Sequence, residues 1–313
     1  MPPHSSSVHN KIAREKLYKD EKRLKAKTKL ERRKEFERDE RDDPEKRAKR
    51  LAENVPLTIE SKRVFDETLM QKGDEEDEEL LADAENDPFA EYFANKIPPK
   101  MLITTSKNPT VATYDFAGEL IDVFPNAEYV KRGNKFELDQ ICKFASNRGY
   151  TDLLLVNEDQ KKPNAVTLVH LPAGPTMHFT VSSIVLTRKI HNHGRATSHS
   201  PELILNNFST SLGRTLGRHL QSLFPPVPQL EGRQVVTVHN QRDFLFFRRH
   251  RYVFRDVEKV RLQELGPRFT LKLRRVTRGV PGRRTRIEEV EEGKEVEWEW
   301  RADADVDRRK FVL

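Results

Sequence analysis

The sequence predicts an α/β protein in which one domain consists of two similar halves and follows a long basic N-terminal extension. Three observations lead to this prediction. Helix-like and strand-like hydrophobic patterns alternate between residues 100 and 280. A set of three landmarks occurs twice in that part of the chain. Charged residues make up 34% of the chain, against about 25% in a typical globular domain, so solvated tails are expected around a smaller core.

The two halves are predicted from an internal repeat. Each half contains a helix ending in Phe-Pro, then a strand ending in a polar turn, then a strand that opens with Gly-Pro. The offset is 100 residues at the first landmark (120 to 220) and 92 at the last (174 to 266). The first set is LIDVFP (120–125), LLVNEDQ (154–160) and GPTMHFTVSS (174–183), and the second is LQSLFP (220–225), VTVHNQRD (236–243) and GPRFTLKLRR (266–275).

Hydrophobic spacing predicts the individual elements of the domain. Buried strands are expected at 100–106, 152–159 and 165–172. Helices are expected at 113–124 and 138–149, the second with Gly149 as its C-cap. A third helix is predicted between the halves, where Leu212, Leu216, Leu220 and Leu223 fall on one face and Ser209 or Thr210 precedes its start.

Shifts in composition divide the chain into four predicted parts. These are a basic N-terminal extension (1–55), an acidic linker and anchoring segment (56–97), the two-half domain (98–280, with halves of about 98–184 and 185–280) and a C-terminal tail (281–313). The basic extension consists of good helix formers but lacks a sustained heptad pattern. It is therefore either a solvated helix or disordered chain, or a basic helix that orders on RNA or on a partner.

Composition also limits the class of protein. The single cysteine, Cys142, excludes an internal disulfide and is expected in the core of a protein from a reducing compartment. No apolar run reaches the roughly 18–20 residues of a membrane span, and the first residues lack the apolar region of a signal peptide. An intracellular protein without a membrane association is expected. The 57 Lys+Arg against 50 Asp+Glu favour a polyanionic partner.

Motifs for catalysis and cofactor binding are missing from the sequence. It contains no G-x-S-x-G, P-loop, G-x-G-x-x-G or H-E-x-x-H pattern. Glu158 and Asp159 follow one another in a predicted turn, where such residues usually cap or are solvated. The polar loop with His191, His193 and His199 has no cysteine to complete a zinc site. We therefore expect no catalytic residue, no metal, no cofactor and no small-molecule substrate.

The stretch FLFFRRHRYVF (244–254) is the strongest candidate for a binding site. It is predicted as the second strand of a hairpin, after a strand at 234–239 and a turn at 240–243. Since side chains alternate, both faces of this strand are apolar at the ends and cationic in the middle. The strand is expected to bury its ends and to present a band of arginines, whose forks suit phosphates and whose planes stack on bases.

Three interpretations of this strand stay open. The first is an RNA-binding site, in which aromatic side chains stack on unpaired bases. The second is a core strand whose arginines pair with local acids. The third is a protein interface, since arginine and aromatic residues also dominate interface hot spots. The RNA-binding candidates are Arg214, Arg218, Arg233, Arg242, Phe244, Arg248, Arg249, His250, Arg251 and Tyr252, and Lys272, Arg274 and Arg275 extend the same basic patch.

Long stretches of the chain resemble the Brix-domain family of eukaryotic ribosome biogenesis factors. In the second half these are PELILNNFSTSLGRTLGRHLQSLFP, GRQVVTVHNQRDFLFFRRHRYVFR and ELGPRFTLKL. In the first half they are PKMLITTS, TDLLLVNED and HLPAGPTMHFTVSS. The segments TIESKRVFDET (58–68), VHNQRD and RRKFVL (308–313) indicate one particular subgroup. The resemblance covers about residues 98–280.

The resemblance implies a fold of two similar α/β halves and an association of residues 232–255 with RNA binding. It implies a nuclear, nucleolar assembly factor, not an enzyme, which binds pre-rRNA and assists assembly and pre-rRNA maturation of the large (60S) subunit. Proteins of the pre-60S particle are implied as partners, together with a small partner of the MAK-sixteen type in a heterodimer. The insert at 279–307 is a variable tail to which no role transfers.

Overall fold

The computed structural model describes residues 10–42, 44–55, 58, 60–64, 87–95, 97–256, 259–281, 296–301 and 310–313. The chain forms two compact units, residues 1–62 and 63–313. The acidic run at 74–79 and most of the insert at 279–307 lie outside the described residues. The predicted division at residues 55, 97 and 280 therefore stays a prediction.

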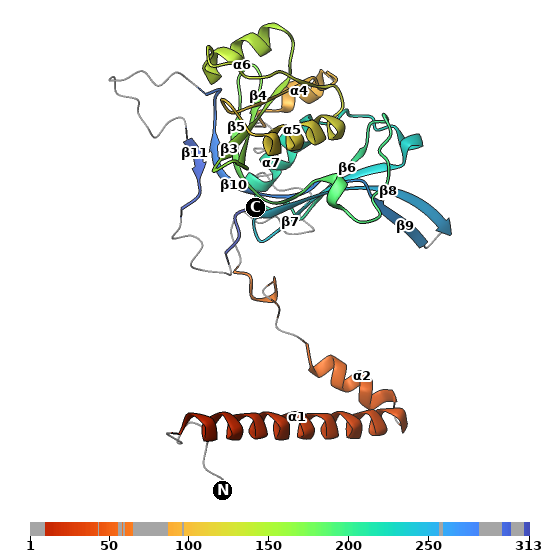
Figure 1. The fold of residues 1–313 in the computed structure, drawn as a ribbon. Coiled ribbons are helices and arrows are strands. Elements are labelled where there is room, and N and C mark those ends of the chain that lie inside the picture. The colour runs from red at the N-terminus through yellow and green to blue at the C-terminus, as the bar shows by residue number, and fades with distance from the viewer. Residues whose placement is uncertain are drawn as a thin grey trace. The chain divides into compact units, whose positions relative to one another are not determined.

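The first unit contains α1 (Lys11–Asp42), α2 (Pro44–Glu53) and the short 3₁₀ helix η2 (Glu60–Lys62) (Figure 1). Asn10 caps α1, because its Oδ1 accepts hydrogen bonds from the backbone N–H of Ile12 and Ala13. Most apolar residues of α1 are exposed, with Ile12 at 80% and Leu24 at 63%. No helix in the described part of the chain is long and apolar enough to cross a membrane.

The second unit begins with the elements of the first predicted half. These are α4 (Ala90–Ala94), β1 (Met101–Thr105), α5 (Val111–Val123), β2 (Ala127–Tyr129), α6 (Leu138–Asn147), β3 (Asp152–Asp159), β4 (Lys162–His170) and β5 (Thr176–Val185). Gly149 follows α6 with a φ of 73°, as its predicted place at the end of that helix requires. Glu158 accepts hydrogen bonds from the backbone N–H of Thr110 and the hydroxyls of Thr110 and Thr113, so it caps the start of α5.

The second half follows the same plan. Its elements are η3 (Thr187–Lys189), β6 (Glu202–Asn206), α7 (Ser211–Ser222), η4 (Leu230–Gly232), β7 (Gln234–Gln241), β8 (Phe244–Asp256), β9 (Lys259–Glu264), β10 (Arg268–Thr277) and β11 (Val296–Glu299). Of the two predicted caps of α7, Thr210 is the one observed, and its hydroxyl accepts from the N–H of Gly213 at 2.9 Å.

All strands join one mixed sheet in the order β2-β1-β3-β4-β5-β10-β8-β7-β6, with β9 paired to β8 and β11 to β10. In the first half β1 lies parallel to β3, and β3, β4 and β5 are antiparallel. In the second half β6 lies parallel to β7, and β7, β8 and β10 are antiparallel. The halves meet where β5 pairs with β10, so the repeat seen in the sequence is confirmed by the strand order.

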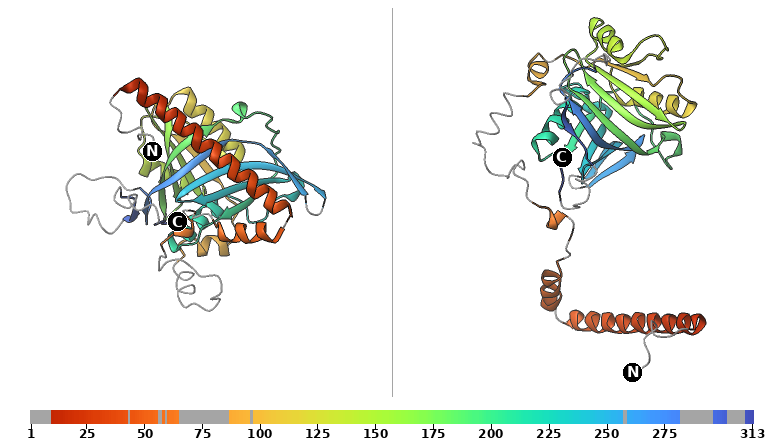
Figure 2. Two further views of the ribbon diagram at one scale, coloured as in Figure 1. Left: turned by 90° about the horizontal axis from the view of Figure 1, so that it is seen from below. Right: turned by 90° about the vertical axis from the view of Figure 1, so that its left-hand side faces the viewer.

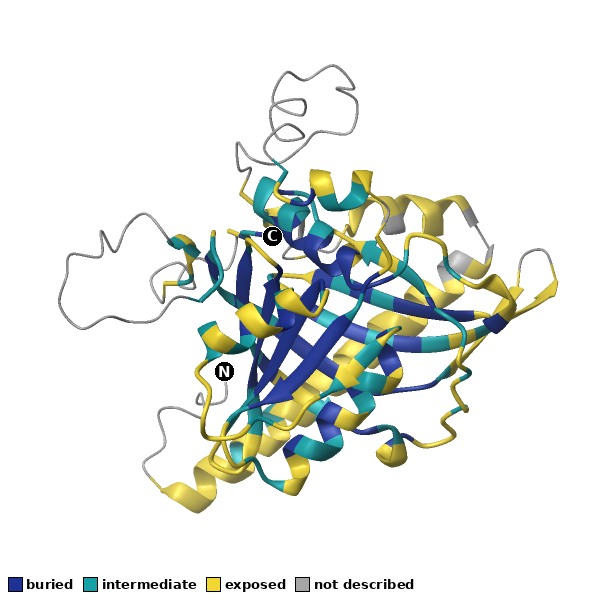
Figure 3. Cartoon of the chain, turned by 90° about the horizontal axis from the view of Figure 1, so that it is seen from above, coloured by how far each residue is buried: buried dark blue, intermediate teal, exposed yellow. Residues whose placement is uncertain are grey.

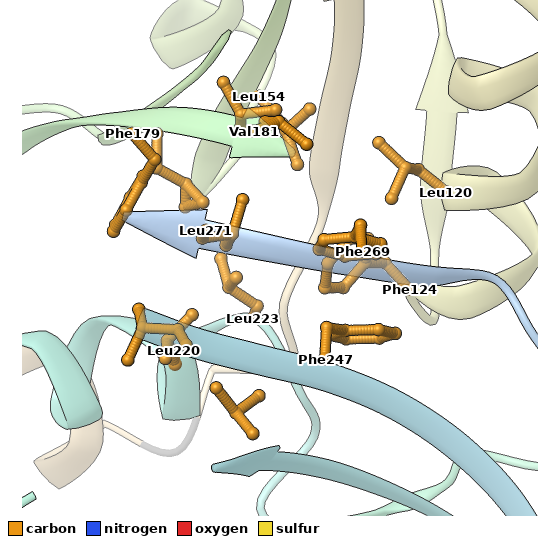
Figure 4. Packing of buried hydrophobic residues seen from close by; sticks show 14 of the residues in the cluster. Leu120, Phe124, Leu154, Phe179, Val181, Leu220, Leu223, Phe247, Phe269 and Leu271 are labelled. Carbon is orange, nitrogen blue, oxygen red and sulfur yellow. The ribbon is translucent and has the colours of Figure 1, made fainter. Parts of the chain in front are cut away.

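The main core lies on the face of the sheet that α5 and α7 cover, and the sheet curves around these two helices (Figures 1 and 2). Of the four leucines predicted on one face, Leu216 and Leu220 of α7 and Leu223 just after it are buried, and Leu212 is partly buried against the same core. The rings of Phe247 and Phe269 stack in this core with centroids 4.3 Å apart and an interplanar angle of 10° (Figure 4).

A smaller core lies on the opposite face of the first half. It joins α6 to β1, β3 and β4 through residues such as Leu102, Leu153 and Val169. Cys142 belongs to it with 1% exposure, which confirms the prediction that this cysteine is a core residue. The corresponding face of β7, β8 and β10 carries no such apolar cluster among the described residues, and this difference leaves one side of the second half uncovered.

The predicted hairpin is present, but its turn was predicted two residues too long. Strand β7 continues to Gln241, and only Arg242 and Asp243 form the turn, with φ values of 56° and 62°. Two-residue hairpin turns with positive φ at both positions match the twist of the strands, and they normally carry Asn, Asp or Gly. Arg242 is atypical there, which explains why the sequence did not reveal so tight a turn.

Candidate nucleic-acid interface

The uncovered side of the second half, which we call the open face, is formed by side chains of β7, β8 and β10. Paired residues in antiparallel strands point to the same side of a sheet. Phe246 pairs with Thr270, Phe244 with Lys272, and Arg248 with Thr237. The open face therefore consists of Thr237, His239, Phe244, Phe246, Arg248, His250, Arg268, Thr270, Lys272 and Arg274.

Cations and aromatic rings are interleaved on the open face. The Nζ of Lys272 lies 5.0 Å from the ring centre of Phe244, which is 40% exposed. Trp300, just after β11, covers both Lys272 at 5.0 Å and the guanidinium of Arg274 at 4.1 Å. The backbone N–H of Trp300 donates to the carbonyl of Arg274 at 2.8 Å, which fixes the indole beside β10. Such a surface offers both charge for phosphates and rings for unpaired bases.

A β-bulge adds a further arginine to this surface. The register between β10 and β5 shifts between Leu273 and Arg275, so Arg275 lies opposite His178. The Nε of Arg274 donates to the Thr180 hydroxyl at 2.8 Å. Bulges commonly re-aim side chains in this way. As a result, Arg274 and Arg275 both lie against β5, although they are consecutive in the sequence.

Arg268 and Arg248 of the open face are also held by groups of the chain itself. Arg268 donates from Nε and Nη2 to the two carboxylate oxygens of Glu264, each at 2.5 Å, and these hydrogen bonds lower the pKa of Glu264. The Nη1 of Arg248 donates to the carbonyl of Phe247 at 2.7 Å. Partial burial lowers the pKa of Arg248 and that of His250, so the imidazole is biased toward its neutral form.

Arg249 lies on the other side of strand β8 from Arg248. Its side chain is 3% exposed, and its Nη2 donates to Oε1 of Gln234 at 2.7 Å. Burial lowers the pKa of Arg249, against the opposing effect of Asp122. It lines a cavity of about 750 Å³ together with Glu119, Asp122 and Arg195. Side chains of adjacent strand residues point to opposite faces of the sheet. Arg248 and Arg249 therefore lie on different sides and do not form one band of arginines.

The remaining predicted residues of the hairpin are spread over several surfaces. Arg251 is exposed and follows Arg249 on the side away from the open face. The hydroxyl of Tyr252 donates to Glu202 at 2.7 Å, and this hydrogen bond raises the pKa of Tyr252. Arg233 is exposed in a left-handed conformation before β7, and Arg242 is exposed in the hairpin turn.

Helix α7 places Arg214 and Arg218 away from the open face, because α7 packs on the core side of the sheet. Asp87 binds Arg218, whose Nε and Nη2 both lie 2.9 Å from Oδ2. The guanidinium also lies over the ring of Phe93 at 4.2 Å. Arg218 therefore fastens the segment around α4 to the domain.

The far end of strand β8 does not match the expectation that both its ends are buried. Leu245 and Phe247 are buried, but Val253 is 44% and Phe254 is 66% exposed. Strand β9 pairs with this end, and its Leu262 is 62% exposed. The end of the β8–β9 hairpin projects beyond the sheet, where no helix packs against it among the described residues (Figure 3). The expectation of two buried ends is therefore wrong.

The structure brings another set of side chains, not the three loop histidines, close enough together to hold an ion. Across the described residues, the group of His, Cys, Asp and Glu side chains close enough to share an ion is Asp152, His170 and His219, all buried. His191, His193 and His199 are not part of it. The Nδ1 of His199 instead lies 3.0 Å from the Thr197 hydroxyl.

Trp300 was missed by the sequence analysis. It falls inside a charged segment that carries no pattern linking it to Lys272 and Arg274 in β10, 28 and 26 positions earlier. The local alternation in VEWEW was the available signal, since it is typical of a half-exposed strand. Only the pairing of β11 with β10 brings this indole to Lys272 and Arg274.

The domain that carries the open face matches a recognised family. A Brix domain is matched over residues 106–275, which is more than half of the chain. The protein belongs to the Brix-domain family.

The sequence similarity to known proteins extends over nearly the whole chain. It is 44% identical to Ribosome production factor 1 of Saccharomyces cerevisiae, over 98% of this chain and 98% of that protein. It is 53% identical to a Brix domain-containing protein of Schizosaccharomyces pombe, over 98% of this chain and 99% of that protein. A probable ribosomal biogenesis protein from Aeropyrum pernix K1 has a solved structure with 15% identity and a TM-score of 0.43, covering 59% of this chain and 98% of that one. This last likeness is too low to add to the fold described above.

Proposed function

We propose that this protein is a ribosome biogenesis factor that binds pre-rRNA and assists assembly and pre-rRNA maturation of the large (60S) subunit. Its membership of the Brix-domain family supports this proposal, as does its similarity to proteins named Ribosome production factor 1. It acts in the nucleolus of the nucleus as an assembly factor and not as an enzyme. Its partners are pre-rRNA, proteins of the pre-60S particle and a MAK-sixteen-type protein with which it forms a heterodimer.

The open face is the observation that carries the RNA-binding part of this proposal. It combines Arg248, Lys272 and Arg274 with Phe244 and Trp300 on a side of the sheet where the described part of the chain forms no apolar layer. Lysine and arginine supply salt-dependent binding to phosphates, and exposed rings stack on unpaired bases. Of the ten residues predicted from sequence, Phe244, Arg248 and His250 belong to this surface. The buried Arg249 and the paired Arg218 support the domain instead of contacting RNA.

A second candidate function is supported by the end of the β8–β9 hairpin. Val253, Phe254, Val260 and Leu262 are all more than 40% exposed there. Exposed apolar groups gathered at one place commonly mark a protein interface. A nucleolar scaffold that binds a protein through this hairpin is therefore the alternative, and both functions are compatible in a single chain.

The test is the salt dependence of RNA binding. We compare the full-length protein with the double variant Arg248→Gln, Lys272→Gln and with a matched control, Lys161→Gln, Lys162→Gln, in the exposed β3–β4 turn. Binding to a single-stranded pre-rRNA fragment is measured at several salt concentrations. Each phosphate contact that is lost lowers the slope of log K against log salt by about 0.7, so the open-face variant should lose about 1.4.

The same three proteins are then crosslinked to RNA in cells. Fragments from large-subunit pre-rRNA that are lost in the open-face variant and kept in the control support the proposal. Equal slopes and equal crosslinking in all three proteins would assign the RNA contact to another part of the chain. Loss of a co-purifying protein in Phe254→Ser, with RNA binding unchanged, would favour the scaffold.

A further inference from the structure

A second pocket lies on the first half of the domain, on the face that α6 covers. It has a volume of about 610 Å³ and lies between α6 and the loop that follows β2. Its floor is aliphatic, with Leu102, Ile141 and Ala145, and the rings of Phe136 and Phe144 stand at its edge in an edge-to-face pair with centroids 5.4 Å apart. These two rings are 46% and 47% exposed, so the pocket is open to a ligand.

The rim of this pocket is cationic. Arg132, Lys135 and Arg148 line it, and no carboxylate of the described residues does. Lys131 lines it too, but its Nζ lies 5.8 Å from the ring centre of Tyr114. The side chain of Arg132 is 10% exposed, and its Nε has no hydrogen-bond partner among the described residues. Its nearest acid, Glu137, lies 3.9 Å from Nη2. A buried guanidinium donor without a partner favours an acceptor supplied from outside the pocket, and a carboxylate is the strongest one.

The apolar floor and the cationic rim together favour one class of ligand, an acidic peptide with aliphatic side chains that enter the pocket. A planar base would need a flat surface for stacking, whereas this floor consists of branched and small aliphatic side chains. The chain itself contains such a peptide. Residues 74–81 read DEEDEELL, and residues 73–87 contain nine carboxylates and no lysine or arginine.

The acidic segment is joined to the domain by a short stretch of chain that ends at Phe89. Residues 65–86 lie outside the described residues, and the chain is anchored again where the ring of Phe89 lies 4.9 Å from that of His170. His170 Nδ1 is 2.8 Å from Asp152, two residues after Tyr150 in the pocket wall. Eight residues separate Leu81 from Phe89, and an extended chain of that length spans about 26 Å. The segment from Leu81 onward can therefore lie up to about 26 Å from Phe89.

We propose that this pocket is the docking site of the chain's own acidic segment, residues 74–81. Leu80 and Leu81 occupy the aliphatic floor, and the carboxylates of DEEDEE contact the cationic rim. Arg132 Nε donates to one of these carboxylates. The inference does not depend on RNA binding by the open face, because it concerns the other half of the domain and a protein ligand.

Carbodiimide crosslinking of the full-length chain tests this docking, because it joins a carboxylate to a nearby lysine amine as an amide. Crosslinks from residues 74–79 to Lys131 and Lys135 are compared with those to Lys161 and Lys162, an exposed pair outside the pocket. Mass spectrometry counts both. The variant Leu80→Ala, Leu81→Ala keeps every charge but removes the anchors, so crosslinks to the pocket lysines should fall about tenfold and those to the control pair should not change. Phe144→Ala should produce the same loss from the pocket side.

Three results would overturn the proposal. Equal crosslinking to both lysine pairs, unaffected by the leucine changes, would indicate general charge attraction. Crosslinks found only between isotopically light and heavy chains would assign the pocket to a second copy. Ultraviolet crosslinking of RNA to Phe136 or Phe144 in the full-length protein would assign the pocket to nucleic acid.

Discussion

Arg249 donates a hydrogen bond of 2.7 Å from its Nη2 to Oε1 of Gln234, and both side chains are buried. The amide nitrogen of Gln234 in turn donates to the carbonyls of Thr197 and His199. Arg249 therefore holds the loop before β6 through a single glutamine. In the sequence it appears equivalent to Arg248, but its position in the fold makes it a structural residue.

We predict that Arg249→Ala lowers the free energy of unfolding by about 1–3 kcal/mol, because Gln234 Oε1 is left buried without a donor. The control Arg251→Ala changes an exposed arginine on the same side of the strand and should alter stability by less than about 0.5 kcal/mol. Chemical denaturation of both variants measures the difference. A fully stable Arg249→Ala protein that has lost RNA binding would show that Arg249 contacts RNA.

The end of the chain contributes a second long-range contact. Leu313 is 1% exposed, and its carbonyl accepts from Nδ2 of Asn240 at 3.0 Å. Asp243 Oδ1 accepts from the N–H groups of Val312 and Leu313, each at 2.9 Å. The Thr210 hydroxyl, which caps α7, donates to the carbonyl of Val312 at 2.8 Å. These residues join the hairpin turn to the start of α7.

We predict that Leu313→Ala destabilises the domain by about 2–5 kcal/mol, as expected for a buried leucine in the main core. Leu262→Ala, at a leucine that is 62% exposed on β9, is the matched control and should cost less than about 0.5 kcal/mol. Thermal unfolding of both proteins makes the comparison. Similar melting temperatures would show that the contact of Leu313 with the core is not maintained in solution.

The sequence predicted the fold better than the site, and the reason is physical. Hydrophobic periodicity is local, and duplicated landmarks such as the two Gly-Pro strand starts repeat within the chain. Both could be seen without knowing how strands pair. The open face instead depends on the pairing of β10 with β8 and β11, which brings Trp300 to Lys272. Pairings between distant strands leave no mark in a single sequence.

Strand β8 shows the same limit at the level of one residue. Alternation correctly assigned Arg248 and Arg249 to opposite faces, but it could not say which face α7 covers. That depends on the core leucines of α7, which pack beside Leu245 and Phe247. The far end of the strand was predicted to be buried because Val253 and Phe254 are apolar. Among the described residues, only β9 pairs with this end of β8 and no helix packs against it.

A buried histidine provides a pH-dependent prediction. His219 is 1% exposed, neither ring nitrogen has a hydrogen-bond partner among the described residues, and burial lowers its pKa to about 3. Oδ1 of Asp152 lies 3.8 Å from Nε2 of His219, a distance too long for a hydrogen bond that would reverse the effect of burial on the pKa. Because the folded-state pKa lies below the unfolded value of about 6.5, the unfolded state binds more protons between these two values.

We therefore predict that stability is fully present above pH 6.5 and falls as the pH decreases toward 3, by on the order of 1 kcal/mol per pH unit from His219 alone. His178 and His250, whose pKa values burial also lowers, add to the same trend. His219→Phe removes the contribution of His219 and should flatten the dependence between pH 6.5 and 5. Denaturation at several pH values checks this, and an unchanged slope in His219→Phe would show that the pKa of His219 is not lowered in the folded protein.

The indole of Trp300 gives a direct readout of the open face. Its ring lies against Lys272 and Arg274, and the chain contains only one other tryptophan, Trp298, which packs against the main core. In the variant Trp298→Phe, the fluorescence reports Trp300 alone. We predict that single-stranded RNA quenches this fluorescence and that Trp300→Ala weakens RNA binding by about 1–3 kcal/mol, the value of one base–aromatic stack. Trp298→Phe itself should bind RNA with unchanged affinity. If RNA binds without any change in Trp300 emission, and if Trp300→Ala binds RNA with full affinity, then this end of the open face does not contact RNA.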